Sequence, residues 1–133
     1  MKLVFDTNVI VAGIVAEGLC RELVEIHIPE HDVVLSTPLW DELVETLREK
    51  FDLEIDELPI VQLCRRHARW VEPSVLQAPV CRGPGADRLL ATALSGGAEA
   101  IVTGDQDLLV LKRWSGSKIL SPRGFLERLT PAK

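Results

Sequence analysis

The chain has 133 residues, of which 47% are hydrophobic and 26% are charged. This mixture is typical of a soluble folded protein and excludes an intrinsically disordered chain, and the length predicts one domain over residues 1–133. The formal net charge of −5 excludes a protein that binds nucleic acid through a broad basic surface, because such binding depends on many phosphate contacts. A nuclease is not excluded, since a site built from carboxylates is acidic until it binds metal ions.

Targeting segments and disulfides are not expected. No apolar run is long enough to cross a bilayer, and Asp6 interrupts the N-terminal apolar run before it could act as a secretory signal. We therefore expect a cytoplasmic protein without membrane association. The cysteines (Cys20, Cys64 and Cys81) are odd in number and widely spaced, which predicts reduced thiols. Cys64 and His67 have a spacing that a helix could offer to zinc, but no second pair of ligands accompanies them.

Strand-like and helix-like apolar patterns alternate along the chain, which indicates βαβ units and an α/β fold with a parallel sheet. Strands are predicted over residues 2–5, 33–35, 100–102 and 119–120, and helices over residues 8–16, 18–28, 38–50, 56–70, 87–95 and from Pro122 onward. In this prediction Pro29 ends the second helix. Thr37 caps the third helix, which Pro38 opens.

Two of the predicted strands lead to a carboxylate. The apolar run over residues 2–5 stops at Asp6, and the strand over residues 100–102 is followed by Asp105 after a short turn. In an open parallel sheet, ligand sites form outside the carboxyl ends of the strands, where the strand order reverses. We therefore expect Asp6 and Asp105 to share one acidic centre.

Two further acids are expected near the same sheet edge. Glu42 lies in the first turn of the helix that follows the second strand, whereas Glu45 and Glu49 are interpreted as a solvated helix face. Asp87 begins the helix that precedes the strand over residues 100–102. As a helix N-cap alone, Asp87 would stabilise that helix by about 1 kcal/mol; together with the other acids it is a candidate ligand.

Four neighbouring acids have a predictable chemistry. Two carboxylates about 5 Å apart repel each other by roughly 3 kcal/mol at an effective dielectric constant near 20, so such a group takes up protons or cations. Mg²⁺ and Mn²⁺ prefer oxygen ligands of this kind and promote hydrolysis of phosphodiesters. The pattern therefore predicts metal-assisted phosphodiester hydrolysis.

Polar neighbours of these acids have supporting roles in this hypothesis. Thr7 or Asn8 could orient the Asp6 carboxylate by hydrogen bonding, and Thr103 could do the same near Asp105. Asp107 has two interpretations: it assists a second ion, or it caps the short helical turn after Gly104.

One basic stripe occurs in the sequence. Arg65, Arg66 and Arg69 lie on the polar face of the helix predicted over residues 56–70. Such a stripe is more commonly a solvated helix face, but a stripe beside an acidic metal site could bind an RNA backbone.

Four ordered motifs make the chain similar to a known family. They are VFDTNV at residues 4–9, LSTP at 35–38 with EL at 42–43, DRLLATA at 87–93, and IVTGD at 101–105 with DLL at 107–109. In these motifs the chain resembles the PIN domains, and among them the toxin-like PIN proteins of bacterial and archaeal toxin–antitoxin pairs. The resemblance covers nearly the whole chain.

The resemblance implies a fold and an activity. It implies a three-layer α/β/α sandwich around a parallel sheet and a Mg²⁺- or Mn²⁺-dependent endoribonuclease that acts on RNA. It also implies a homodimer and a cognate antitoxin. Carried over position by position, it implies that Asp6, Glu42, Asp87 and Asp105 are the catalytic, metal-binding acids.

The sequence also departs from the family pattern. The loop before the third acid is often rich in aspartate, whereas residues 82–86 here contain none and leave Asp87 as the only acid. The alternative hypothesis is therefore a PIN-like RNA-binding or protein-interaction module with weak or no catalysis. A phosphatase or receiver domain is disfavoured, because Asn8 stands where the phosphatase would need a second acid.

Overall fold

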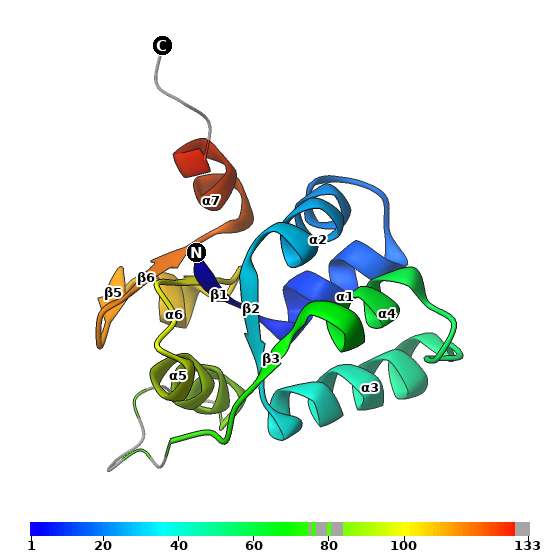
Figure 1. Cartoon of the computed structure of the whole chain (residues 1–133), viewed down its shortest axis with the longest axis horizontal. Coiled ribbons are helices and arrows are strands. Elements are labelled where there is room, and N and C mark those ends of the chain that lie inside the picture. Colours follow the sequence, from blue (N-terminus) through cyan, green and yellow to red (C-terminus); the bar gives the residue numbers. More distant parts are fainter. Residues whose placement is uncertain (75, 77–79, 81–83, 130–133) are drawn as a thin grey trace.

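Strands and helices alternate along most of the chain. The computed structural model describes residues 1–74, 76, 80 and 84–129 (Figure 1). Its strands are β1 (Lys2–Phe5), β2 (Asp32–Leu35), β3 (Arg69–Trp70), β4 (Ala100–Val102), β5 (Arg113–Trp114) and β6 (Ser117–Leu120). Its helices are α1 (Thr7–Val15), α2 (Leu19–Glu30), α3 (Thr37–Phe51), α4 (Pro59–His67), α5 (Pro84–Gly96), α6 (Gln106–Leu109) and α7 (Pro122–Leu129).

The strands form one twisted layer. Within the described residues the sheet has the order β3-β2-β1-β4-β6-β5. The pairs β1–β2, β1–β4, β2–β3 and β4–β6 are parallel, and Leu3 lies between Val33 and Ala100. The edge strand β5 is antiparallel to β6. The α/β prediction is therefore confirmed, and the sheet is mixed at one edge because a tight turn at positive-φ Ser115 and Gly116 joins β5 to β6.

The strand order reverses between β1 and β4. From β1 the chain builds outward through β2 to β3, and it then returns to the other side of β1 as β4. Because β1 and β4 are parallel neighbours, their carboxyl ends open at the same edge of the sheet. This is the topological switch point at which ligands bind in open α/β sheets.

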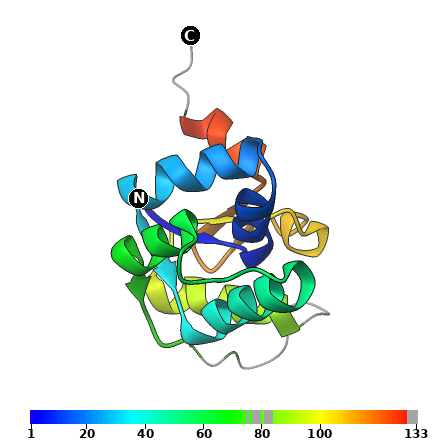
Figure 2. The ribbon, with the colours of Figure 1, turned by 90° about the vertical axis from the view of Figure 1, so that its right-hand side faces the viewer.

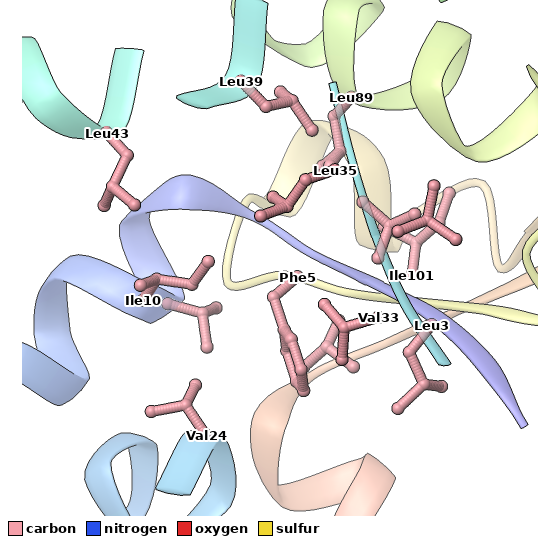
Figure 3. Packing of buried hydrophobic residues seen from close by; sticks show 14 of the residues in the cluster. Leu3, Phe5, Ile10, Val24, Val33, Leu35, Leu39, Leu43, Leu89 and Ile101 are labelled. Atoms are coloured by element: carbon pink, nitrogen blue, oxygen red, sulfur yellow. The ribbon is translucent and has the colours of Figure 1, made fainter. Parts of the chain in front are cut away.

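Helices cover both faces of the sheet. In Figure 3, Val24 of α2 lies on one side of β1 and β2, and Leu89 of α5 lies on the other. Short strands of this kind are apolar throughout because both of their faces are buried, and residues 3–5 and 33–35 have no exposed surface. Helix α5 packs closely on β2: a Cβ atom on Gly96 would come 2.5 Å from a side-chain carbon of Val34.

Two predictions at helix ends are wrong. Pro29 does not end α2, which continues to Glu30, and the His31 backbone N–H still donates to the His27 carbonyl. A proline next to the helix end removes only its own hydrogen bond. Thr37 is the first residue of α3 and Ser36 is its N-cap, with a side chain that bonds elsewhere.

Two predicted helices have different bounds. The helix predicted over residues 56–70 is α4, which ends at His67, and Arg69–Trp70 instead pairs with β2. Helix α5 begins at Pro84, three residues before the predicted start, so Asp87 lies in its first turn and is not its N-cap. Proline is well suited to a first helical position. Of the loop before the third acid, which the sequence placed at residues 82–86, residues 82–83 lie outside the described residues.

Two simpler expectations concern cysteines and membranes. Cys20 and Cys64 are free thiols, and Cys81 lies outside the described residues. Among the residues that the structure describes, no helix combines the length and the apolar character needed to span a membrane.

Candidate active site

Asp6 follows β1 and caps helix α1. Its Oδ1 accepts a hydrogen bond from the Asn8 backbone N–H (3.1 Å), which satisfies one of the free donors at the helix start. Its Oδ2 accepts a hydrogen bond from the Thr103 hydroxyl (2.7 Å). Both oxygens are therefore oriented, one by the next helix and one by the neighbouring strand.

Thr103 connects the two strand-end acids. This buried residue follows β4, and its hydroxyl donates to Asp6 and accepts from the Asp105 backbone N–H (3.0 Å). Asp105 in turn caps α6, because its Oδ1 accepts from the Asp107 backbone N–H (2.9 Å). The capping role that the sequence offered to Asp107 thus belongs to Asp105, and one hydroxyl links the segments that carry Asp6 and Asp105.

A pocket of about 240 Å³ opens at this edge of the sheet. It is lined by Asp6, Asn8, Glu42, Gly85, Ala86, Asp105 and Asp107. Figure 2 shows α6 and the starts of α1 and α5 on the same side of the molecule, in agreement with this lining. The structure therefore brings together three of the four predicted acids, Asp6, Glu42 and Asp105.

The fourth predicted acid lies beside the pocket rather than in its lining. Asp87 follows Ala86 by one residue in α5, and its Oδ1 accepts a hydrogen bond from the Val80 backbone N–H (3.0 Å). One of its oxygens thus holds the segment before α5. Of the predicted supporting residues, Asn8 and Asp107 line the pocket, whereas Thr7 is buried in the first turn of α1.

Glu42 reaches the pocket from α3, close to the start of α5. Its Oε1 is 3.3 Å from the position that a Cβ atom on Gly85 would occupy. The two helices are joined behind the pocket by a buried hydrogen bond between the Ser36 and Thr92 hydroxyls (2.7 Å). Because the Thr92 hydroxyl donates to the Arg88 carbonyl (2.9 Å), Ser36 is the donor of this pair.

A larger hollow, of about 390 Å³, lies along the outer face of α3. It is lined by Trp40, Asp41, Val44, Glu45, Arg48 and Glu49. It contains none of the acids that follow a strand. The predicted solvated face of Glu45 and Glu49 lies here, while Glu42 alone of these three glutamates lines the sheet-edge pocket. We therefore consider the smaller pocket the candidate active site.

The donor set of this pocket suits a hard divalent cation. Its acidic members offer carboxylate oxygens, the ligands that Mg²⁺ and Mn²⁺ prefer. The ligand atoms of these acids do not lie close together, however. Among the described residues, the one group of three or more metal-binding side chains with ligand atoms all within 4.8 Å of one another is His27, Glu30 and His31.

That second group was missed by the sequence analysis. The spacing of His27, Glu30 and His31 places all three on one side of a helix end, and this spacing was the available signal. The group lies outside the sheet-edge pocket, since His31 comes immediately before β2 and the acids follow the strands.

The family follows from a match over most of the chain. The model of the PIN domain matches residues 2–107. The chain belongs to the PIN domain family. The matched range contains all four predicted acids, and PIN domains are generally nucleases that use divalent metal ions. No curated protein matches the chain closely enough to count as a relative.

Cys64 and His67, which the sequence offered as a pair of zinc ligands, do not form a plausible zinc site in this PIN domain. Cys64 is buried and His67 is exposed. Burial raises the pKa of the Cys64 thiol to about 12, which disfavours the thiolate that zinc requires. His67 lies in the last turn of α4 and faces solvent.

The three arginines of the predicted basic stripe do not share one helix. Arg65 and Arg66 are exposed on α4, and Arg69 is exposed on β3. Arg65 forms an ion pair with Asp56 (2.8 Å) and its guanidinium lies 5.6 Å from the ring centroid of Trp40. Trp40 also contacts Trp70 edge to face, at 5.5 Å between ring centroids. Their positions in the sequence gave no indication of this contact between the two tryptophans.

Proposed function

We propose that this PIN domain is a Mg²⁺- or Mn²⁺-dependent endoribonuclease and the toxin of a toxin–antitoxin pair. The observation that carries the proposal is that Asp6, Glu42 and Asp105, from three separate segments, line one pocket at the switch point of the sheet. In this proposal the catalytic, metal-binding acids are Asp6, Glu42, Asp87 and Asp105.

The residues of the pocket have distinct roles in this proposal. A bound divalent ion would supply positive charge to the phosphodiester and acidify a water molecule. Asp6 is held in one orientation by Thr103 and the Asn8 N–H, so it can bind an ion with little loss of side-chain entropy. Asp105 is held in the same way by the Asp107 N–H. Glu42 approaches from the opposite side, and Asp87 completes the set from α5.

RNA would reach this pocket past an aromatic and basic surface. Trp40 lines the hollow along α3 and contacts Trp70, which ends β3 with 45% of its surface exposed. Aromatic rings of this kind stack on unpaired bases, and arginines contact the phosphates between them. We propose that Arg65, Arg66 and Arg69, with Trp40 and Trp70, contact single-stranded RNA.

The proposed partners are a cognate antitoxin and a second copy of this chain. Both proposals rest on the similarity of the four motifs to toxin-like PIN proteins. Light scattering on the purified chain measures the homodimer. Purification after coexpression with the product of an adjacent short gene, if one is present, measures the antitoxin complex.

One observation favours a second candidate function, a PIN-like module that binds RNA or protein without useful turnover. No three of the four acids have ligand atoms within 4.8 Å of one another. Asp87, in the first turn of α5, is also the only acid within residues 82–87. A binding module would bind RNA through the same arginines and tryptophans and take up no metal ion in the pocket.

The deciding experiment is cleavage of structured and single-stranded RNAs in Mg²⁺, Mn²⁺ or EDTA, with Asp6→Asn beside the wild type. Cleavage that needs metal and is lost in Asp6→Asn supports the nuclease. Calorimetry with Mn²⁺ provides the second readout. RNA binding without cleavage and without metal uptake by the wild type would replace the nuclease with the binding module.

A further inference from the structure

A cluster of metal-binding side chains lies at the C-terminal end of α2. His27 and Glu30 belong to the helix, and His31 is its C-cap residue. One ligand atom from each of the three residues lies within 4.8 Å of the other two. The imidazole rings are stacked, with centroids 5.3 Å apart and planes at 27°. Two imidazoles and a carboxylate are the donor set of many zinc sites.

The two imidazoles are held in place by the core. Phe125 of α7 is buried and meets both rings edge to face, with its centroid 5.4 Å from His27 and 6.3 Å from His31. Helix α7 packs against α2, as Figure 2 shows. Phe125 also contacts Phe5 of β1. The histidines therefore lose little further freedom on binding a ligand, which favours affinity.

One imidazole nitrogen lacks a hydrogen-bond partner among the described residues. His27 Nδ1 is buried and accepts or donates no hydrogen bond within the described part of the chain. Glu30 Oε2 is 3.9 Å from this nitrogen, which is too far for a hydrogen bond. A buried polar atom without a partner is costly, and an unseen ion is one of its ordinary explanations.

The three ligand atoms all lie within 4.8 Å of one another and must come closer together to bind one ion. Zinc–nitrogen and zinc–oxygen bonds of about 2.0–2.1 Å in a tetrahedron separate ligand atoms by roughly 3.3 Å. The 3.9 Å between His27 and Glu30 is only slightly larger. The Glu30 side chain is 64% exposed, so it can close this gap by a rotamer change without disturbing the core.

The local charges and protonation are also suitable. Glu30 and Asp32 are negative and flank His31, whereas the N-terminal amine and His27 act on His31 with the opposite sign. Burial lowers the pKa of both imidazoles from the ordinary value. Neutral imidazole is the form that binds metal ions.

We propose that His27, Glu30 and His31 bind a divalent transition-metal ion of the Zn²⁺ class. Imidazole ligands select such ions over Mg²⁺. The site lies immediately before β2, at the amino ends of the parallel strands. The acids that follow β1 and β4 lie at the opposite, carboxyl ends. Three protein ligands leave one position for water or for a ligand from another molecule. All three ligands belong to the end of α2, so the ion would stabilise this end of the helix.

The test is Zn²⁺ binding to the metal-stripped chain, with excess Mg²⁺ present to occupy the carboxylate pocket. Calorimetry is expected to give one Zn²⁺ per chain, and thermal melting is expected to rise by several degrees with Zn²⁺ relative to EDTA, since a ligand of the native state stabilises it. Glu30→Gln and His31→Gln are expected to lose at least about tenfold in Zn²⁺ affinity.

Three control variants make the test specific. Glu25→Gln makes the same charge change on the exposed face of α2, and His67→Gln removes an exposed histidine on α4; both should bind Zn²⁺ as the wild type does. Asp105→Asn should also retain binding, which separates this site from the acidic pocket. Melting in EDTA shows whether Glu30→Gln and His31→Gln are folded. The proposal is overturned if these two bind Zn²⁺ with unchanged affinity, or if the wild type binds none at millimolar Zn²⁺.

Discussion

The two sides of the acidic pocket are built in different ways. On the strand side, Asp6 and Asp105 each follow a parallel strand, and the Thr103 hydroxyl contacts both segments. On the helix side, Glu42 and Asp87 come from α3 and α5. The position of those helices depends on packing between parts of the chain that are far apart in sequence, such as the Ser36–Thr92 hydrogen bond.

The acids on the strand side are therefore positioned by local contacts, and the acids on the helix side by long-range contacts. The strand side is organised by neighbouring residues and by one strand pair, so a change there should affect the acids directly. The helix side is organised by the contact between α3 and α5, so a change there should act on stability first and on activity second. Four substitutions test this separation, in order of decreasing expected loss of RNA cleavage.

Asp105→Asn should lower RNA cleavage by more than about 100-fold, because a metal ligand contributes several kcal/mol to the transition state. The fold should remain intact, since asparagine caps a helix as well as aspartate does and the substitution relieves carboxylate repulsion. Cleavage rates and thermal melting measure the two effects. Loss of folding in this variant would make Asp105 a structural residue and remove it from the proposed site.

Thr103→Val should lower cleavage by about 10- to 100-fold, because a side chain that orients a metal ligand typically matters by this factor. The variant loses the hydrogen bond to Asp6 and leaves the Asp105 N–H without its partner, which should cost about 1–3 kcal/mol of stability. Thr103→Ser retains the hydroxyl and is the matched control. Equal cleavage by Thr103→Val and the wild type would mean that the Asp6 orientation does not limit the reaction.

Ser36→Ala should lower the free energy of unfolding by about 1 kcal/mol, the usual contribution of a buried hydrogen bond. Cleavage should fall only a few-fold, because the helices retain their apolar packing. Chemical denaturation of Ser36→Ala, Thr92→Val and the double variant measures the coupling. Since the two hydroxyls bond to each other, the effects of the single changes should not add. Fully additive losses would show that the hydrogen bond does not join α3 to α5.

Gly85→Ala should have the smallest effect. The new Cβ would lie 3.3 Å from Glu42 Oε1, so the carboxylate must move by a few tenths of an ångström. Cleavage should fall by roughly two- to fivefold, far less than the 100-fold expected for a displacement of about 1 Å. Stability should stay level or rise by about 0.4–1 kcal/mol, because alanine restricts the unfolded chain.

The control for Gly85→Ala is the same substitution in a Glu42→Gln background. If the methyl group acts through Glu42, it should have little further effect on cleavage there. An equal loss in both backgrounds would place the effect elsewhere in the pocket.

The strands next to the site could be predicted from sequence because their signals are local. The run over residues 2–5 and the run over residues 100–102 are short, apolar and followed by an acid, and β1 and β4 have these bounds. The strand β3 could not be found in this way. Arg69–Trp70 continues the polar and apolar pattern of α4, and only its pairing with Val34 and Leu35 makes it a strand.

Asp87 shows the same limit within the site. The sequence placed it at the start of a helix and near the other acids. The helix begins three residues earlier, at Pro84, and the Asp87 carboxylate accepts a hydrogen bond from Val80. A proline followed by glycine is typical of a loop in sequence, whereas in the structure both residues belong to α5, which contacts α3 and β2.

By itself, the sequence determined the α/β class, the two strand–acid junctions and the motifs of the PIN domain, because each depends on residues within one short segment. The tertiary structure alone decided the adjacency of β1 and β4, the entry of Glu42 into the pocket and the position of Asp87 beside it. It also decided that the His27 ring contacts Phe125 and that its buried Nδ1 has no hydrogen-bond partner among the described residues. These features depend on contacts between distant segments, and such contacts leave no periodic pattern in a single sequence.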